Sequence, residues 1–142
     1  MSPAFSGFPP RSRFISLPDA FITTLLPQIS DLAEVKATLY ILRAIYLKRG
    51  SPRFVIQGEL ESTREMVEMV GGVEKLQQVL SQAVQRGTLL RLEVKRGERE
   101  YQLYFLNDEP SRRAWEKIIK GQLPLGELAQ FPSPGPAAAP AR

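Results

Sequence analysis

The sequence predicts an α+β fold that is mainly helical and carries a small antiparallel β-sheet. Residues 31–50 and 73–86 space their apolar side chains three and four positions apart, as amphipathic helices do. Residues 89–106 instead alternate apolar and polar side chains on either side of an Arg-Gly turn, which is the pattern of a hairpin. A chain of 142 residues is long enough for one domain with a hydrophobic core, but not for two domains and a linker.

Proline and capping signals define the first helices. Residues 18–27, PDAFITTLLP, predict a short helix whose first proline occupies a tolerated first-turn position. Asp31 opens a stronger helix, because Glu34 follows three residues later as a capping-box partner, and Gly50 ends it. The apolar stripe of this helix is wider than one small domain usually needs. It consists of Leu32, Val35, Leu39, Leu42 and Tyr46, flanked by Ile41 and Ile45.

The middle of the chain predicts a short strand and two further helices. The strand is RFVI at 53–56, and a polar helix is expected from about Gly58 to Val70. Gly71 and Gly72 interrupt the chain, and an amphipathic helix then runs over 73–86. The apolar side of that helix consists of Val73, Leu76, Leu80, Ala83 and Val84.

The hairpin and one more helix complete the predicted fold. In both strands, apolar residues alternate with polar ones, so one face of the hairpin is expected to be buried. The apolar residues are Leu90, Leu92 and Val94 before the turn and Tyr101, Leu103 and Phe105 after it. Residues 111–121, SRRAWEKIIKG, predict a basic helix anchored by Trp115, Ile118 and Ile119. Helix, turn, helix and a two-stranded wing, in this order, are the winged helix-turn-helix arrangement.

The two ends of the chain differ in composition from this core. Residues 1–13 contain three prolines among small residues and arginines, and predict an unstructured leader. Residues 122–142 end in the Pro/Ala-rich run FPSPGPAAAPAR and predict a disordered tail. The winged-helix domain is therefore expected to span residues 14–121.

Composition excludes several classes of function. The chain has no cysteine and no histidine, so it lacks thiol nucleophiles, the usual general base and the commonest metal ligands. No glycine-rich phosphate loop and no marked carboxylate pair occurs. We therefore expect no enzyme activity, no cofactor and no metal. Nothing resembles a signal peptide or a membrane span, which predicts a cytoplasmic protein with no membrane contact.

Three groups of polar residues are candidates for DNA binding in such a fold, in which the helix after the turn enters the major groove and the wing contacts the backbone. The net charge of +4 favours an acidic partner without demanding one. The first group is the polar face of helix 73–86, formed by Lys75, Gln78, Ser81, Gln82 and Gln85. Glutamine can bond an adenine edge, but a solvated polar face is an equally admissible explanation, because this helix has no arginine before Arg86.

The second and third groups are basic. The hairpin tip offers Lys95, Arg96 and Arg99, interleaved with glutamates that could absorb much of this charge. The densest positive patch belongs to the last helix and consists of Arg112, Arg113, Lys117 and Lys120. For both groups, phosphate contact and an ordinary solvated surface remain alternatives.

The segment from Phe14 to Leu26 is more apolar than a leader needs to be. Its side chains could cover the domain's own core or cross to a second subunit together with the wide apolar stripe of helix 31–50. The candidate oligomer interface consists of Phe14, Leu17, Phe21, Ile22 and Leu25.

Three stretches of the chain resemble the amino-terminal domain of bacterial DnaD-like replication proteins. They are 15–50, 53–60 and 80–107, and the likeness covers about residues 14–107. The matching motifs are an I-P-x-x-F-like segment with Pro18 and Phe21, a Leu-rich helix over 32–42, an EL helix start at 59–60, and an A-x-x-R-G-x-L junction. That junction consists of Ala83, Arg86, Gly87 and Leu89.

The resemblance implies a winged-helix primosome protein that self-associates and acts in replication initiation or restart. It also implies DNA, a replication initiator and helicase-loading proteins as partners. Members of the family typically carry a second, carboxy-terminal helical domain that supplies much of the DNA binding, whereas this sequence continues into a Pro/Ala-rich tail. Either the chain is a shortened relative or helix 111–121 takes that role. A winged-helix transcriptional regulator and a protein-interaction module without DNA affinity are the alternatives.

Overall fold

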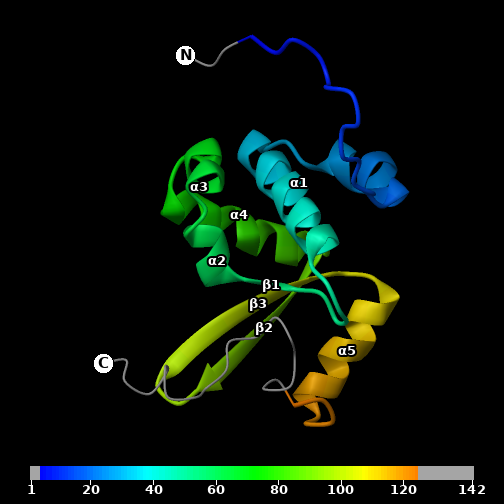
Figure 1. Ribbon diagram of the computed structural model, residues 1–142. Coiled ribbons are helices and arrows are strands. Elements are labelled where there is room, and N and C mark those ends of the chain that lie inside the picture. The colour runs from blue at the N-terminus through cyan, green and yellow to red at the C-terminus, as the bar shows by residue number, and fades with distance from the viewer. Residues whose placement is uncertain (1–3, 125–142) are drawn as a thin grey trace.

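An antiparallel sheet of three strands lies between a group of helices on one face and a single helix on the other (Figure 1). The structure is a computed structural model that describes residues 4–124. The strands are β1 (Val55–Ile56), β2 (Leu89–Arg96) and β3 (Arg99–Leu106), in the spatial order β1-β3-β2. β2 and β3 form the predicted hairpin, with Leu92 opposite Leu103. β1 pairs with the far edge of β3 and is shorter than the strand expected at 53–56.

Four α-helices pack on one face of the sheet and one packs on the other. The first group contains α1 (Leu32–Leu47), α2 (Gln57–Glu61), α3 (Arg64–Val70) and α4 (Val73–Arg86). α5 (Glu109–Ile119) covers the opposite face (Figure 1). A π-helical turn η1 (Phe21–Leu25) and a 3₁₀ turn η2 (Leu26–Gln28) precede α1 and correspond to the helix predicted at 18–27.

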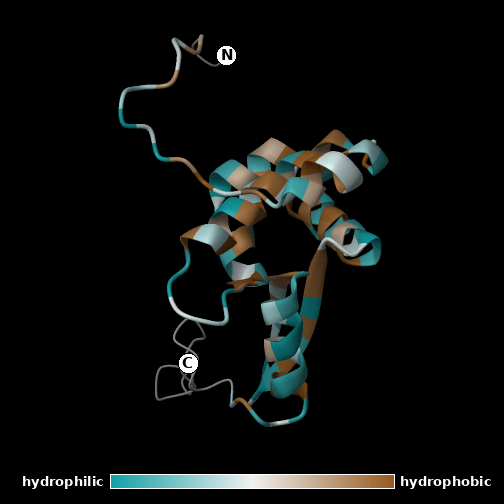
Figure 2. Cartoon of the chain, turned by 90° about the vertical axis from the view of Figure 1, so that its right-hand side faces the viewer, coloured by the Kyte–Doolittle hydropathy of each residue, from teal (hydrophilic) through white to brown (hydrophobic). Residues whose placement is uncertain are grey.

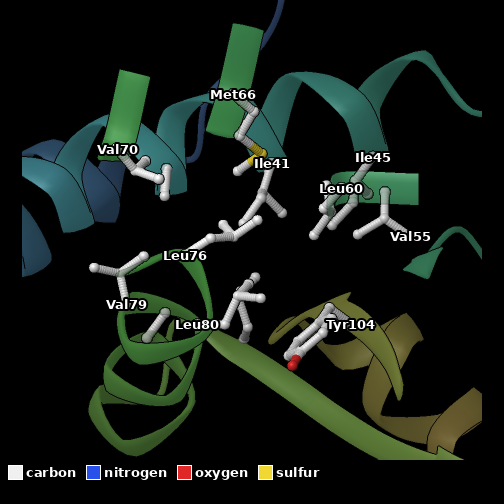
Figure 3. Packing of buried hydrophobic residues seen from close by; sticks show 13 residues of the cluster. Ile41, Ile45, Val55, Leu60, Met66, Val70, Leu76, Val79, Leu80 and Tyr104 are labelled. Carbon is white, nitrogen blue, oxygen red and sulfur yellow. The ribbon is translucent and has the colours of Figure 1, made fainter. Parts of the chain in front are cut away.

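The single helix predicted from about Gly58 to Val70 is wrong, because the chain forms α2 and α3 with a break at residues 62–63. The Ser62 hydroxyl donates to the Gly58 carbonyl at 2.8 Å, and the Thr63 hydroxyl donates to the Glu59 carbonyl at 2.8 Å. Side-chain hydroxyls that bond nearby carbonyls compete with continuation of the helix. The break lets Leu60 on α2 and Met66 on α3 enter the same core (Figure 3).

The two faces of the sheet carry separate cores. On the helical side, side chains from α1, α3 and α4 converge on Val55 and Tyr104 (Figure 3). On the other side, Phe54 and Phe105 pack with ring centroids 5.3 Å apart beneath Trp115 and Ile118 of α5. The indole N–H of Trp115 donates to the backbone carbonyl of Arg91 at 3.0 Å. α5 is therefore held to the sheet by both apolar contacts and a hydrogen bond.

α5 starts two residues earlier than the helix predicted at 111–121. The Asp108 side chain accepts a hydrogen bond from the Ser111 amide at 3.0 Å, and Pro110 occupies the first turn, where its missing N–H costs nothing. Of the predicted tail, only residues 122–124 are described, so the expectation of disorder lies outside the described residues. Residues 4–13 form neither helix nor strand. No helix in residues 4–124 is long and apolar enough to cross a membrane.

Candidate nucleic-acid interface

α4 is fixed between two glycine positions and buries one side. Gly72 precedes it with φ 120°, Gly87 follows it with φ 92°, and such left-handed backbone is accessible mainly to glycine. The buried side of α4 consists of Leu76, Val79, Leu80 and Ala83. The positions of α4 open to solvent beyond the terminal Val73 are Glu74, Gln77, Gln78 and Gln85. Sequence reasoning identified Gln78 and Gln85 on this face, but missed Glu74 and Gln77.

Two residues expected on the open face of α4, Lys75 and Gln82, instead lie half-buried. The Lys75 ammonium donates to the Asp31 carboxylate at 2.9 Å, and Asp31 also caps α1 by accepting from the Ala33 amide. The hydrogen bond from Lys75 lowers the pKa of Asp31 below its usual range. The side-chain oxygen of Gln82 is shielded from solvent. The prediction that Lys75 and Gln82 belong to the exposed face is therefore wrong, since Lys75 is bonded to Asp31 and the Gln82 oxygen is buried without a hydrogen-bond partner in the described residues.

The remaining cation of α4, Arg86, is also neutralised within the fold. Its guanidinium makes two hydrogen bonds to the Glu34 carboxylate, at 2.8 and 2.9 Å, and a third to the Gln28 carbonyl at 3.2 Å. The Glu34 side chain is only 1% exposed, and this pairing raises the pKa of Arg86. Glu34 thus binds Arg86 and does not show the capping-box role expected from its position after Asp31.

The surface formed by α2, α3 and α4 is rich in carboxylates. Residues 57–86 contain Glu59, Glu61, Glu65, Glu68 and Glu74, against Arg64, Lys75 and Arg86. Two of those three cations are paired with the acids of α1 and its cap, and Arg64 lies 3.7 Å from Glu68. Lys48 at the end of α1 pairs with Glu59 at 2.9 Å, so this surface keeps only a small excess of carboxylates, which does not attract a polyanion.

A chain of hydrogen bonds ties the base of the hairpin to α2 and α4. The Tyr104 hydroxyl donates to Gln57 at 2.7 Å, and Arg91 donates to both that hydroxyl, at 3.2 Å, and the Ser81 hydroxyl, at 3.0 Å. Gln57 and Gln77 in turn both donate to the Glu61 carboxylate, at 2.8 and 2.9 Å. Burial raises the pKa of Tyr104. Ser81 is therefore held by Arg91, and the hairpin has a fixed position relative to α4.

The basic residues of the hairpin tip divide between the two faces of the sheet. Lys95 lies on the helical side, where its strand partner is Glu100. Arg96 and Arg99 are partners of each other, and the alternation of the strands places both on the side of Leu92 and Leu103, the face that α5 covers. The structure thus brings only two of the three predicted tip residues to one face.

Most of α5 is hydrophilic (Figure 2), and its basic residues are exposed. Arg113, Lys117 and Lys120 are exposed, and Arg113 lies 3.1 Å from Glu109 one turn earlier, a pair open to water on both sides. Arg112 is exposed as well, but its guanidinium donates to the Asn107 side chain at 2.9 Å.

We call the side of the sheet that carries α5 the basic face. It gathers Arg96, Arg99, Arg112, Arg113, Lys117 and Lys120, against the glutamates Glu98, Glu109 and Glu116. This face is separated by the sheet from the open side of α4 (Figure 1). The predicted DNA-binding residues therefore do not form one continuous surface.

The candidate oligomer residues also separate. Phe21 is 2% exposed and packs with Ile29 and Leu42 in the chain's own core, so its assignment to a subunit interface is wrong. Leu17 and Leu25 pack partly against the same cluster, whereas Phe14 and Ile22 are exposed. Sequence reasoning did not identify which part of the α1 stripe stays uncovered. That part is Leu32, Leu39 and Tyr46, and Leu47, which lies outside the stripe, is exposed as well.

Comparisons with protein families, with curated proteins and with solved structures find no match to this chain. Within residues 4–124, no group of acidic side chains has the arrangement of a metal site.

Proposed function

We propose that the chain is a non-enzymatic winged-helix protein of the DnaD type that binds DNA during replication initiation or restart in the cytoplasm. In this proposal α3 and α4 are the helix-turn-helix and β2–β3 is the wing. The order of elements supports the winged-helix assignment, and the resemblance over about residues 14–107 supports the family. Replication initiator and helicase-loading proteins are the partners that this assignment implies.

The observation that carries the DNA proposal is the separation of charge by the sheet. The basic face collects six cationic side chains against three glutamates, whereas the α2–α4 surface is acidic and pairs two of its own cations internally. Phosphate neutralisation by Lys and Arg supplies most of the affinity of non-specific DNA binding. The basic face is therefore the proposed DNA contact, and α4 is not the element that enters the groove.

This geometry argues against a transcriptional regulator that reads an operator with α4. Base readout needs the helix to approach the duplex closely, yet Glu74 lies on its open side and Lys75 and Arg86 are committed to Asp31 and Glu34. Gln78 and Gln85 remain exposed, but the two cations of α4 itself, Lys75 and Arg86, are paired with acids of the fold. We expect binding that depends on salt more than on sequence.

Self-association is proposed through α1. Leu32, Leu39 and Tyr46 recur every seven residues, which places them on one side of the helix, and they are 64%, 37% and 40% exposed. A row of this kind is the pattern by which helices pair. Ile22, 48% exposed on η1, provides a further uncovered apolar side chain.

Two charge-matched triple variants test the DNA proposal. Arg113→Gln, Lys117→Gln and Lys120→Gln remove three charges from the basic face and spare Arg112, whose contact with Asn107 is structural. Lys36→Gln, Arg43→Gln and Arg64→Gln remove three exposed charges from α1 and α3. Both proteins lose the same net charge. Lys36 and Arg43 lie four positions after Leu32 and Leu39, on the side of α1 proposed for self-association, so light scattering of the control variant must show an unchanged mass before a difference in binding is assigned to the position of the charge.

Fluorescence anisotropy with a labelled duplex at several salt concentrations is the measurement. The first variant should lose most of its affinity, with a salt slope shallower by about 0.9 for each phosphate contact removed. The control variant should bind nearly as the unmodified protein does. Equal losses in the two variants, or none in the first, would remove the basic face as the DNA contact. A strong preference for one palindrome would favour the regulator alternative.

A further inference from the structure

The segment before η1 is an exposed arm with three aromatic rings. Phe5, Phe8 and Phe14 are 71%, 85% and 84% exposed, although phenylalanine is usually buried. In both orientations the arm extends away from the helices before it reaches the first helical turn (Figures 1 and 2). The anchor of the arm is Phe21, which is buried in the core. The three rings are therefore presented to solvent from a fixed point of attachment.

A turn gives part of the arm a defined shape. The Ser12 hydroxyl donates to the Pro9 carbonyl, and Arg11 takes a left-handed backbone conformation with φ 62°. This turn folds the chain so that Phe8 and Phe14 line one concave surface together with Arg11 and Arg13. Aromatic planes and guanidinium groups thus border the same space.

The charge of the arm has one sign. Residues 4–18 contain Arg11 and Arg13 and no carboxylate, and the first acidic residue of the chain is Asp19. Within residues 4–124, neither guanidinium makes a hydrogen bond or ion pair, in contrast to the paired cations Lys75 and Arg86 of α4. A polyanion with flat apolar groups complements both the positive charge and the exposed aromatic rings of the arm.

We infer that the arm binds single-stranded nucleic acid, with unpaired bases stacked on Phe8 and Phe14 and phosphates next to Arg11 and Arg13. Aromatic stacking combined with arginine is the general basis of sequence-tolerant single-strand binding. Phe5 packs edge to face against Phe8, with ring centroids 5.0 Å apart and 71° between the ring planes, and is the third exposed ring of the arm. The inference deepens the proposed function and rests on it for the choice of ligand.

The strandedness of the ligand follows from the rings. In a duplex each base is stacked between its neighbours, so its faces are covered and an exposed phenylalanine has nothing to stack on. Unpaired bases offer those faces freely. The basic face needs only phosphates and accepts either form of DNA. The arm therefore adds a preference for single strands to a domain that binds the DNA backbone.

The test compares binding of the full chain to a labelled oligothymidylate and to a labelled duplex of the same length. Changing Phe5, Phe8 and Phe14 together to alanine should weaken single-strand binding by about fivefold or more for each ring that stacks, and duplex binding by less than about twofold. Matched variants separate stacking from general hydrophobicity. Tyrosine at the three positions should keep the affinity, and leucine should lose it, because leucine is apolar but has no ring.

The arginines provide a second readout. Arg11→Gln with Arg13→Gln should make the salt slope of single-strand binding shallower by up to about 0.7 for each residue. Three results would overturn the inference: equal losses on single strand and duplex, no loss in the alanine variant, or full affinity in the leucine variant. The last would mean that apolar contact, and not stacking on aromatic rings, holds the strand. The basic-face variant discriminates further. If the basic-face variant keeps its duplex affinity while the arm variant loses single-strand affinity, the proposed duplex contact is refuted and the proposed single-strand contact of the arm is supported.

Discussion

Replacing Arg86 with alanine should destabilise the fold strongly and leave DNA affinity unchanged. The guanidinium is the only cation bonded to the Glu34 carboxylate among the described contacts, and the side chains of Glu34 and Arg86 are 1% and 24% exposed. Removing Arg86 leaves a carboxylate buried without its partner. It also frees the Gln28 carbonyl, which loosens the connection between η2 and α4.

The structure predicts which substitution of the Glu34–Arg86 pair lowers the free energy of unfolding most. Removing one partner of a buried ion pair costs about 3–5 kcal/mol, and the partial exposure of Arg86 places Arg86→Ala near the lower end, about 3 kcal/mol. Glu34→Gln should cost less, about 1–2 kcal/mol, because its oxygen still accepts a hydrogen bond and Arg86 can reach water. The double variant Glu34→Leu with Arg86→Met removes both charges together and should be more stable than Arg86→Ala alone.

Urea unfolding followed by far-ultraviolet circular dichroism measures these free energies, and duplex anisotropy measures binding on the same proteins. If Arg86→Ala costs less than about 1 kcal/mol, or no more than Glu34→Gln, then Glu34 is not left as an uncompensated buried charge in the Arg86→Ala variant, and the reasoning is refuted. If duplex affinity falls in Arg86→Ala at a temperature where the variant is folded, Arg86 contacts DNA and the assignment of α4 as a helix without free cations fails.

Three further results are expected. Changing Lys95, Arg96 and Arg99 to alanine should cost no more than about 0.5 kcal/mol of stability for each residue. Duplex affinity should drop, and its salt slope should become shallower by about one unit for each phosphate that is no longer neutralised. A marked loss of stability would contradict the placement of these residues at the tip. Leu39→Glu should reduce the mass measured by light scattering relative to the unmodified chain, whereas a monomer in both cases would refute association through α1. Because Lys75 lowers the pKa of Asp31, the stability from this pair is present above the unfolded aspartate pKa of about 3.9 and is lost as pH falls through the pKa of Asp31 in the folded protein. Asp31→Asn should lose less stability than the unmodified protein during acid titration. An unchanged profile would contradict a stabilising Asp31–Lys75 pair.

Elements with local signals could be predicted from the sequence. The hairpin follows from strict alternation around Gly97, and α4 follows from apolar spacing between glycine stops, so both lie close to where the pattern places them. The break between α2 and α3 was missed because Ser62 and Thr63 are compatible with a helix until their hydroxyls bond to the preceding turn. That competition depends on side-chain rotamers, which periodicity does not describe.

The candidate site depends on contacts between distant residues, and those had no sequence signal. Lys75 and Arg86 bind acids 44 and 52 positions away, so nothing local distinguished them from free cations on an open helix face. The composition of α5 predicted its positive patch, but not that α5 would lie on the opposite face of the sheet from α4. Phe21 illustrates the same limit, since apolar spacing does not tell a core contact from a subunit contact.

The attachment of α5 through Trp115 makes the chain its own spectroscopic reporter. Trp115 is the single tryptophan of the sequence, and its indole bonds to β2 while its ring lies against the core beneath α5. Its emission therefore follows the local solvent exposure of α5, whereas circular dichroism follows the helices of the whole chain. A red shift of the emission at denaturant concentrations where helicity is intact would reveal detachment of α5 as a separate step before global unfolding.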